Sequence, residues 1–272
     1  METHEKIINM QKVSCKAGHK YLLRDITWQV KSGEHWAVFG MNGSGKTTLL
    51  SIIAGFKQHT QGLVEIFGEQ FNNDNVLDFR RKIGWVSASF FDKYYTKESA
   101  LHIVLSGRNG TLGLDDEITL ADVQLAKALL TELHLGDRVD CTFDMFSKGE
   151  RQNILIARAL ISNPDILILD EPCTGLDVYN RSYLFNTIEE LSQKKDLTII
   201  YVTHYVEEIR PLFQKTLLLK NGHIFAKGDT AMLMQEETIS ELLGYPVTMQ
   251  QVADGTYQLN IKTKSTLTKL LK

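Results

Sequence analysis

The sequence contains few of the features that mark secreted, disordered or membrane-spanning proteins. It has only three cysteines in 272 residues, all far apart, which is typical of a protein from a reducing compartment. It has only four prolines and no Gly/Ser-rich or Pro-rich tract, so a long disordered linker is not expected. No stretch approaches about 18 consecutive apolar residues, the length that a membrane-spanning helix needs. The charged N-terminus leads into no apolar segment, so a secretory signal is not expected.

An excess of charge of either sign is also missing. Thirty Lys and Arg residues stand against 33 Asp and Glu residues, for a formal net charge of −3. A dedicated nucleic-acid-binding domain normally has a basic excess, so we do not expect nucleic acid as a partner. The hydrophobic share of 43% and the length are those of an ordinary globular protein with one large domain, or one and a half.

The pattern of apolar residues predicts a mixed α/β fold. Helical spacing of apolar residues dominates between about 90 and 160, which predicts a helical subdomain inserted into a strand-rich chain. Strands alternating with helices, after strands at the start, predict an α/β core with an antiparallel β layer. The predicted strands are 7–14, 21–30, 36–39, 63–67, 81–86, 166–169 and 197–202, with a hairpin around Asn221-Gly222 and two strands after Pro246. The predicted helices outside the insertion are 47–54, 179–191, a short one at 206–213 and one near 232–243.

A glycine-rich segment between a predicted strand and a predicted helix matches the phosphate-loop pattern G-x-x-x-x-G-K-[ST]. Its glycines allow successive backbone N–H groups to point at a phosphate, and the N-terminus of the helix adds a positive field. We expect Lys46 to contact the β- and γ-phosphates of ATP and the Thr47 hydroxyl to bind Mg²⁺. A glycine-rich turn that binds no phosphate is the alternative, and the flanking strand and helix disfavour it. The residues predicted to bind the nucleotide here are Gly40, Met41, Asn42, Gly43, Ser44, Gly45, Lys46, Thr47 and Thr48.

Two carboxylates and a histidine end two other predicted strands. Because the carboxyl ends of parallel strands face the ligand crevice, Asp170 is expected to reach the Mg²⁺ of the same nucleotide. Glu171 is then free to orient or deprotonate a water molecule aimed at the γ-phosphate. His204 ends a strand predicted to lie beside that of Asp170, so it is expected to reach the γ-phosphate from the same edge. We therefore predict Lys46, Glu171 and His204 as catalytic residues, and Thr47 and Asp170 as metal ligands.

Two further segments resemble motifs of the ABC ATPases. Phe146-Ser147-Lys148-Gly149-Glu150-Arg151-Gln152 resembles their signature sequence, and Ser147 with Glu150 also predicts a helix capping box. Thr174-Gly175-Leu176-Asp177 resembles the D-loop, and phosphate loop, signature, carboxylates, D-loop and histidine occur in the order of that family. The resemblance covers roughly residues 5–230. It implies a head-to-tail dimer, with itself or with another ABC ATPase, in which Ser147, Gly149, Glu150 and Asp177 face the ATP of the other protomer.

The resemblance also implies a P-loop NTPase (RecA-like) fold and a division of the chain. We expect a single ABC ATPase domain over 1–272, with a core at about 5–89 and 162–230. The helical subdomain that carries the signature is expected at about 90–161, and a C-terminal extension at about 231–272.

The sequence departs from the family pattern at three places. Ser87-Ala88-Ser89-Phe90 stands where the family has a glutamine after the strand that ends at residue 86. No aromatic residue stands where the family stacks adenine, and Tyr21 is the nearest candidate, although packing on its own sheet is its more ordinary role. Lys148 and Glu150 replace a glycine and a glutamine of the signature. A bacterial subgroup of stand-alone ABC ATPases is resembled by the combination of three segments, Gly33-Glu34-His35-Trp36, Gly84-Trp85-Val86-Ser87 and Gly149-Glu150-Arg151-Gln152.

Three functions fit these motifs to different degrees. The leading hypothesis is the motor subunit of an ABC transporter, which hydrolyses ATP and drives separate membrane-spanning subunits from the cytoplasmic face of the membrane. The alternative is a soluble ABC ATPase that acts on nucleic acid, on ribosomes or in regulation, which the missing glutamine favours. A P-loop kinase is the third, but it would leave the signature and D-loop without a role. The sequence identifies neither the transported substrate nor the direction of transport.

Overall fold

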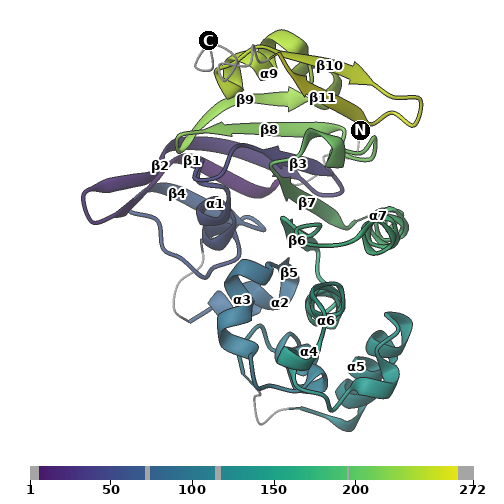
Figure 1. The fold of residues 1–272 in the computed structure, drawn as a ribbon. Helices are drawn as coiled ribbons and strands as arrows, with labels where there is room; N and C mark the ends of the chain where they lie inside the picture. Colours follow the sequence, from purple (N-terminus) through teal and green to yellow (C-terminus); the bar gives the residue numbers. More distant parts are fainter. Residues whose placement is uncertain (1–5, 71–73, 114–117, 195, 263–272) are drawn as a thin grey trace, which may run out of the picture.

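The computed structural model describes residues 6–70, 74–113, 118–194 and 196–262, and a six-stranded sheet forms its centre (Figure 1). The strand order is β5-β6-β7-β3-β8-β9, and all strands except β9 run parallel. The parallel strands are almost entirely buried. Their near-continuous apolar runs are typical of a parallel sheet that other layers cover on both faces. The bounds are Ile83–Val86 for β5, Ile166–Asp170 for β6, Thr198–Thr203 for β7, Trp36–Phe39 for β3, Lys215–Lys220 for β8 and His223–Asp229 for β9.

An antiparallel layer covers one side of this core. It consists of β1 (Lys6–Ala17), β2 (Lys20–Lys31) and β4 (Gln61–Ile66), in the order β2-β1-β4. Helix α1 (Lys46–Ile53) contacts both β2 and β6, and it therefore links this layer to the central sheet (Figure 1).

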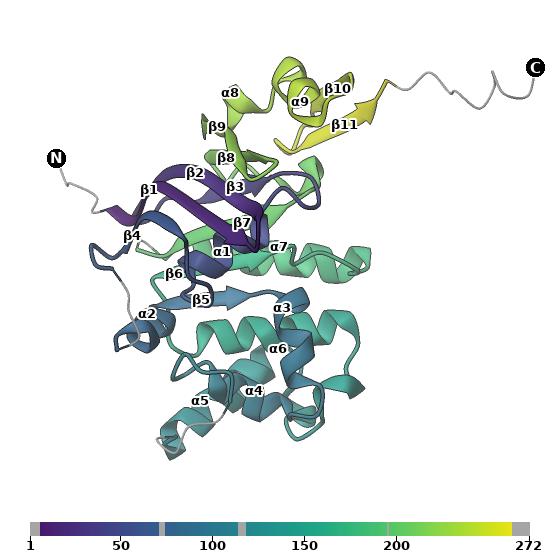
Figure 2. The same cartoon turned by 90° about the vertical axis from the view of Figure 1, so that its left-hand side faces the viewer.

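Helices gather at the end of the molecule opposite the C-terminal strands (Figure 2). One of them, α6 (Lys148–Leu160), packs on β5 and on α4, and its buried Arg158 donates hydrogen bonds to the Tyr95 hydroxyl and the Thr111 carbonyl, both at 2.8 Å. Helix α7 (Val178–Ser192) follows β6 and lies on the side of the central sheet away from α1 (Figure 1). The remaining helices of this region are α2 (Val76–Lys82), α3 (Ala88–Tyr95), α4 (Ala100–Ser106), α5 (Leu120–Glu132) and the short 3₁₀ turns η1 (Gly136–Arg138) and η2 (Phe143–Met145).

The C-terminal part packs against the turn that follows β7. It contains α8 (Thr230–Leu233), α9 (Glu236–Leu243) and the hairpin of β10 (Val247–Gln251) and β11 (Tyr257–Ile261). Strand β11 contacts the 3₁₀ turn η3 (Val206–Glu208), where the Leu259 amide donates a hydrogen bond to Glu207 at 3.4 Å. Arg210 pairs with Asp254 at 3.9 Å close by.

This architecture confirms the predicted α/β core with an antiparallel β layer, and three predicted elements need correction. Residues 76–82 form α2, so the strand predicted from residue 81 begins only at Ile83. The helix predicted over 206–213 is limited to η3, because Pro211 disfavours helical geometry in the residue before it. The helix predicted near 232–243 is two helices, since Gln235 between them is extended.

None of the helices in the described ranges has the length and apolar character needed to span a membrane.

Candidate nucleotide site

The phosphate loop joins β3 to the N-terminus of α1. Gly45 has φ 107° in front of the helix, and a side chain there would come within 2.8 Å of the Leu22 carbonyl. At Gly40, a Cβ would lie 2.4 Å from the Leu219 carbonyl oxygen and 2.6 Å from the Ser44 hydroxyl. The loop therefore requires glycine at both positions, because β2 and the end of β8 press against its backbone.

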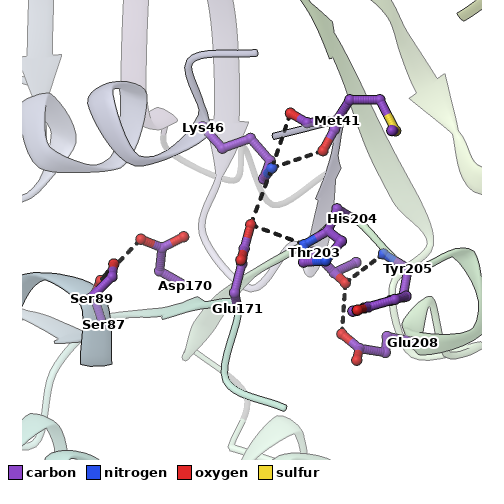
Figure 3. A network of polar contacts seen from close by, with 11 residues as sticks. Met41, Lys46, Ser87, Ser89, Asp170, Glu171, Thr203, His204, Tyr205 and Glu208 are labelled. Atoms are coloured by element: carbon purple, nitrogen blue, oxygen red, sulfur yellow. Dashed lines mark hydrogen bonds and ion pairs between the residues drawn. The ribbon is translucent and has the colours of Figure 1, made fainter. Parts of the chain in front are cut away.

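Lys46 turns back over this loop. Its Nζ donates hydrogen bonds to the carbonyl oxygens of Gly40 at 2.8 Å and Met41 at 3.3 Å, and it pairs with Glu171 Oε1 at 3.2 Å (Figure 3). The side chain is only 5% exposed, so its charge acts in an environment that screens it weakly. An ammonium group held in this way inside a phosphate loop is well placed to bind a phosphate.

Asp170 ends β6 as a buried carboxylate, 5% exposed. The Ser87 hydroxyl donates a hydrogen bond to its Oδ2 at 3.0 Å, whereas its Oδ1 has no hydrogen-bond partner among the described residues (Figure 3). Burial raises the pKa of Asp170 to about 6, and the nearby Glu171 carboxylate also raises it, while Ser87, Thr47 and Lys46 act in the opposite direction. A buried carboxylate with one free oxygen is the kind of group that a divalent cation binds.

The raised pKa of Asp170 predicts a pH-dependent stability in buffer without divalent cations. The folded protein keeps the Asp170 proton up to about pH 6, whereas an unfolded chain releases it near pH 4, so this contribution to stability is lost as the pH rises through that window. The difference in unfolding free energy, Asp170→Asn minus parent, is expected to increase by on the order of 3 kcal/mol from pH 4 to pH 7, because only the parent loses this contribution. Urea unfolding of both proteins across this range measures the difference. Asp165→Asn, which changes an exposed acid just before β6, is the control, and a difference that stays constant with pH would contradict the assignment.

Glu171 follows Asp170 in a conformation that is uncommon for its type. Its φ is 51°, in the left-handed region, and its amide donates a hydrogen bond to the Val202 carbonyl at 2.9 Å. Such strain is retained where the surrounding structure fixes it, often at functional sites. The carboxylate lies between Lys46 and His204, whose Nδ1 is 3.2 Å from Glu171 Oε1, within ion-pair distance but without the geometry of a hydrogen bond (Figure 3).

A buried glutamate fixes the turn that carries His204. Glu208, 3% exposed, accepts hydrogen bonds from the Thr203 hydroxyl at 2.6 Å and the Tyr201 hydroxyl at 3.0 Å. The Tyr205 amide donates to the Thr203 hydroxyl at 2.9 Å, so both neighbours of His204 are tied to this cluster (Figure 3). Burial raises the pKa of Glu208, and the two hydroxyl donors oppose that shift.

A cavity of about 830 Å³ lies between the phosphate loop and the helical part of the chain. Such a volume is in the range of small-molecule sites, and the cavity is lined both by residues of the phosphate loop and by carboxylates. Its lining includes Tyr21, Asn42, Gly43, Gly45, Lys46, Thr47, Thr48, Asp170 and Glu171 from the predicted site, together with Lys20, Ser89, Asp92, Lys148, Arg151, Gln152 and Thr174.

The signature and D-loop segments lie against each other. Ser147 caps α6 and forms the predicted capping box with Glu150, whose carboxylate also pairs with Arg138. Asp177 caps α7 by accepting a hydrogen bond from the Asn180 amide at 2.8 Å, and a Cβ at Gly149 would be 3.1 Å from the Asn180 side chain. The predicted signature and D-loop residues therefore lie next to the cavity but outside its lining. They are Ser147, Gly149, Glu150 and Asp177.

Sequence reasoning identified the phosphate loop and the carboxylates but missed several residues around them. Ser87, which stands at the place of the missing glutamine, donates a hydrogen bond to Asp170, and the sequence did not predict this contact. Tyr21 lines the cavity, and its ring centroid lies 4.4 Å from Lys16 Nζ and 4.2 Å from Arg24 Cζ. Its role toward adenine stays a prediction. Gln152 could have been found from its spacing, because it lies one helical turn after Lys148 and shares its face of α6.

Comparison with known proteins identifies the family of the chain. Residues 23–174 match the family described as ABC transporter. The uncharacterised ABC transporter ATP-binding protein YlmA of Bacillus subtilis (strain 168) is 38% identical, over 89% of this chain and 92% of the relative. The molybdate import ATP-binding protein MolC of Haemophilus influenzae is 31% identical, over 85% of each chain.

Solved structures show the same fold. A chain of an ABC transporter in an inward-facing conformation superposes with a TM-score of 0.75 at 27% identity, covering 96% of this chain and 99% of that one. The ATP-binding cassette MJ0796, in a dimeric post-hydrolysis state with ADP and Pi bound, superposes with a TM-score of 0.71 at 26% identity, covering 82% of this chain and 98% of that one. The resemblance read from the motifs is confirmed, and the chain belongs to the ABC transporter family, among its ATP-binding proteins.

Proposed function

We propose that this chain is the ATP-hydrolysing subunit of an ABC transporter, and that closure of a dimer on ATP moves separate membrane-spanning subunits. The observation that carries the proposal is the convergence of three groups on one cavity. Lys46 of the phosphate loop, Asp170 and Glu171 line it together, and His204 lies against Glu171. This set supplies phosphate binding, a cation ligand and a base, which are the parts that phosphoryl transfer to water requires.

Mg²⁺ fits the groups that line the cavity. Asp170 offers a buried carboxylate oxygen that has no hydrogen-bond partner among the residues that the structure describes, and Thr47 lines the same cavity. Carboxylate and hydroxyl oxygens are ligands that Mg²⁺ accepts, so Thr47 and Asp170 would hold it. When bound, Mg²⁺ would neutralise part of the negative charge of the phosphates.

In the reaction, the side chains of this chain bind phosphate and move one proton. Lys46 leaves its ion pair with Glu171 and binds the β- and γ-phosphates in its place. Glu171 orients a water molecule and accepts its proton while the water oxygen attacks the γ-phosphorus and the bond to ADP breaks. His204 contacts Glu171 on one side and the γ-phosphate on the other. The hydrogen bonds of Glu208 keep the turn that carries His204 in place.

The proposal includes a second ATPase protomer. Ser147, Gly149, Glu150 and Asp177 lie outside the cavity of their own chain, and we assign them to the ATP of the other protomer in a head-to-tail dimer. The dimeric state of MJ0796 supports dimerisation. The partner is a second copy or another ABC ATPase, and the dimer would attach to membrane-spanning subunits on the cytoplasmic face of the membrane.

Purification from the source organism tests the transport part of the proposal. We expect a tagged chain at its natural level to be recovered from detergent-solubilised membranes with an integral membrane protein in stoichiometric amount. Recovery as a dimer without any membrane protein, together with ATP hydrolysis stimulated by RNA or DNA at moderate salt, would contradict transport and favour the alternative, a soluble ABC ATPase.

A further inference from the structure

Gln152 is a buried residue in the wall of the nucleotide cavity whose amide donor is unsatisfied. It lies in the second turn of α6 and is 5% exposed. Its Nε2 has no hydrogen-bond partner within the part of the chain that the structure describes. A buried donor without a partner costs free energy, and native proteins seldom keep one unless a ligand or a function compensates for it.

The lining of the same cavity contains a complementary unsatisfied group. Asp170 Oδ1 is a buried acceptor without a partner among the described residues, while its Oδ2 is bonded to Ser87. The cavity therefore offers one free amide donor and one free carboxylate oxygen. A phosphate group with its bound cation satisfies both, because the phosphate oxygen accepts from the amide and the cation binds the carboxylate.

The loop after β5 does not provide such a donor. Ser87 uses its hydroxyl to bond Asp170, Ala88 has no polar side chain, and the Ser89 hydroxyl lies 3.2 Å from that of Ser87. The side-chain amides in the cavity lining come from Asn42, Gln152 and Asn221. Asn42 belongs to the phosphate loop and Asn221 to the turn between β8 and β9, so Gln152 is the amide contributed by the helical part.

We propose that Gln152 donates its amide N–H to the terminal phosphate of the ATP bound by the phosphate loop of its own chain. The proposal rests on the proposed ATP binding and adds a contact to it. Ser147 and Gly149, assigned above to the ATP of the other protomer, lie on the first turn of the same helix. About 7.5 Å of helix axis separates residues 147 and 152, so a single rigid element joins the two nucleotide sites. A hydrogen bond from Gln152 to the γ-phosphate therefore also fixes the position of the signature segment at the start of α6.

Nucleotide affinities of Gln152→Met test the proposal. Methionine has a similar length but no donor. With Mg²⁺ present and at protein concentrations where gel filtration shows a monomer, we expect adenosine 5′-(β,γ-imido)triphosphate to bind about 10- to 100-fold more weakly than to the parent. ADP affinity is expected to stay within about twofold, because ADP lacks the terminal phosphate. The midpoint of thermal unfolding without nucleotide is expected to rise, since the unsatisfied donor has been removed from the interior.

Gln152→Glu provides a second variant with nearly the same shape. Its carboxylate is expected to weaken binding of the triphosphate analogue further than methionine does, through repulsion of the terminal phosphate. Gln193→Met and Gln193→Glu make the same changes at an exposed position at the end of α7 and are expected to leave both nucleotides unaffected.

One result would overturn the assignment of Gln152. It is an unchanged ratio of analogue to ADP affinity in Gln152→Met, whether both affinities stay at the parent value or both fall by the same factor. A parent protein that binds neither nucleotide would instead refute the proposed function, so the two failures are separable.

Discussion

Glu171→Gln is expected to stop ATP hydrolysis while leaving ATP binding intact. Glutamine keeps the shape of the side chain between Lys46 and His204, each 3.2 Å from its carboxylate, but it cannot accept a proton from water. A general base contributes roughly 10² to 10⁴ in rate, so we expect phosphate release to fall by about that factor. The change also removes a negative charge next to the phosphates, which favours retention of ATP.

The retained ATP is expected to be visible as a change in oligomeric state. With ATP and Mg²⁺, gel filtration of Glu171→Gln should show a dimer that the parent populates only briefly, because hydrolysis no longer opens it. Glu189→Gln makes the same chemical change on the exposed face of α7 and should behave as the parent. Hydrolysis by Glu171→Gln at the parent rate would show that another group activates the water.

Lys46→Ala is expected to have the second large effect, the loss of nucleotide binding. Lys46 is buried, is held by the Gly40 and Met41 carbonyls and carries the cation nearest to Glu171 at 3.2 Å. A hydrogen bond to a charged group contributes about 1.5–3 kcal/mol, and Lys46 is expected to make one to each of two phosphates. Their combined loss corresponds to a decrease in affinity of at least about 100-fold.

Isothermal titration of ATP with Mg²⁺ measures this loss directly. Lys97→Ala, at an exposed lysine after α3, is the matched control. Micromolar affinity in Lys46→Ala would contradict the role of Lys46. An affinity that falls equally in both variants would show that net charge, rather than the phosphate loop, governs binding.

The parts of the site that the sequence predicted are those with local causes. The phosphate loop is a continuous segment whose glycines, lysine and helix N-terminus act together, and the capping box of Ser147 with Glu150 spans only one helical turn. Asp170 and His204 could also be placed, because each ends a strand of a parallel sheet and β6 pairs with β7.

The contacts that the sequence did not predict join segments far apart in the chain. Ser87 and Asp170 are 83 positions apart and meet only because β5 pairs with β6 in a register that no local pattern encodes. Gln152 stands in the amphipathic pattern of α6 as one more buried position, and only the cavity shows that its surroundings are polar.

The packing of the C-terminal hairpin on η3 has a consequence for how the protein is held together. The turn from Thr203 to Pro211 has one side toward Glu171 and the other toward β11, where Glu207 meets Leu259, Arg210 meets Asp254, and Gly255 lies against Pro211. Local opening in proteins follows contiguous units of this kind. We therefore expect the hairpin and the histidine turn to open together, because detachment of the C-terminal strands would remove these contacts from the turn that carries His204.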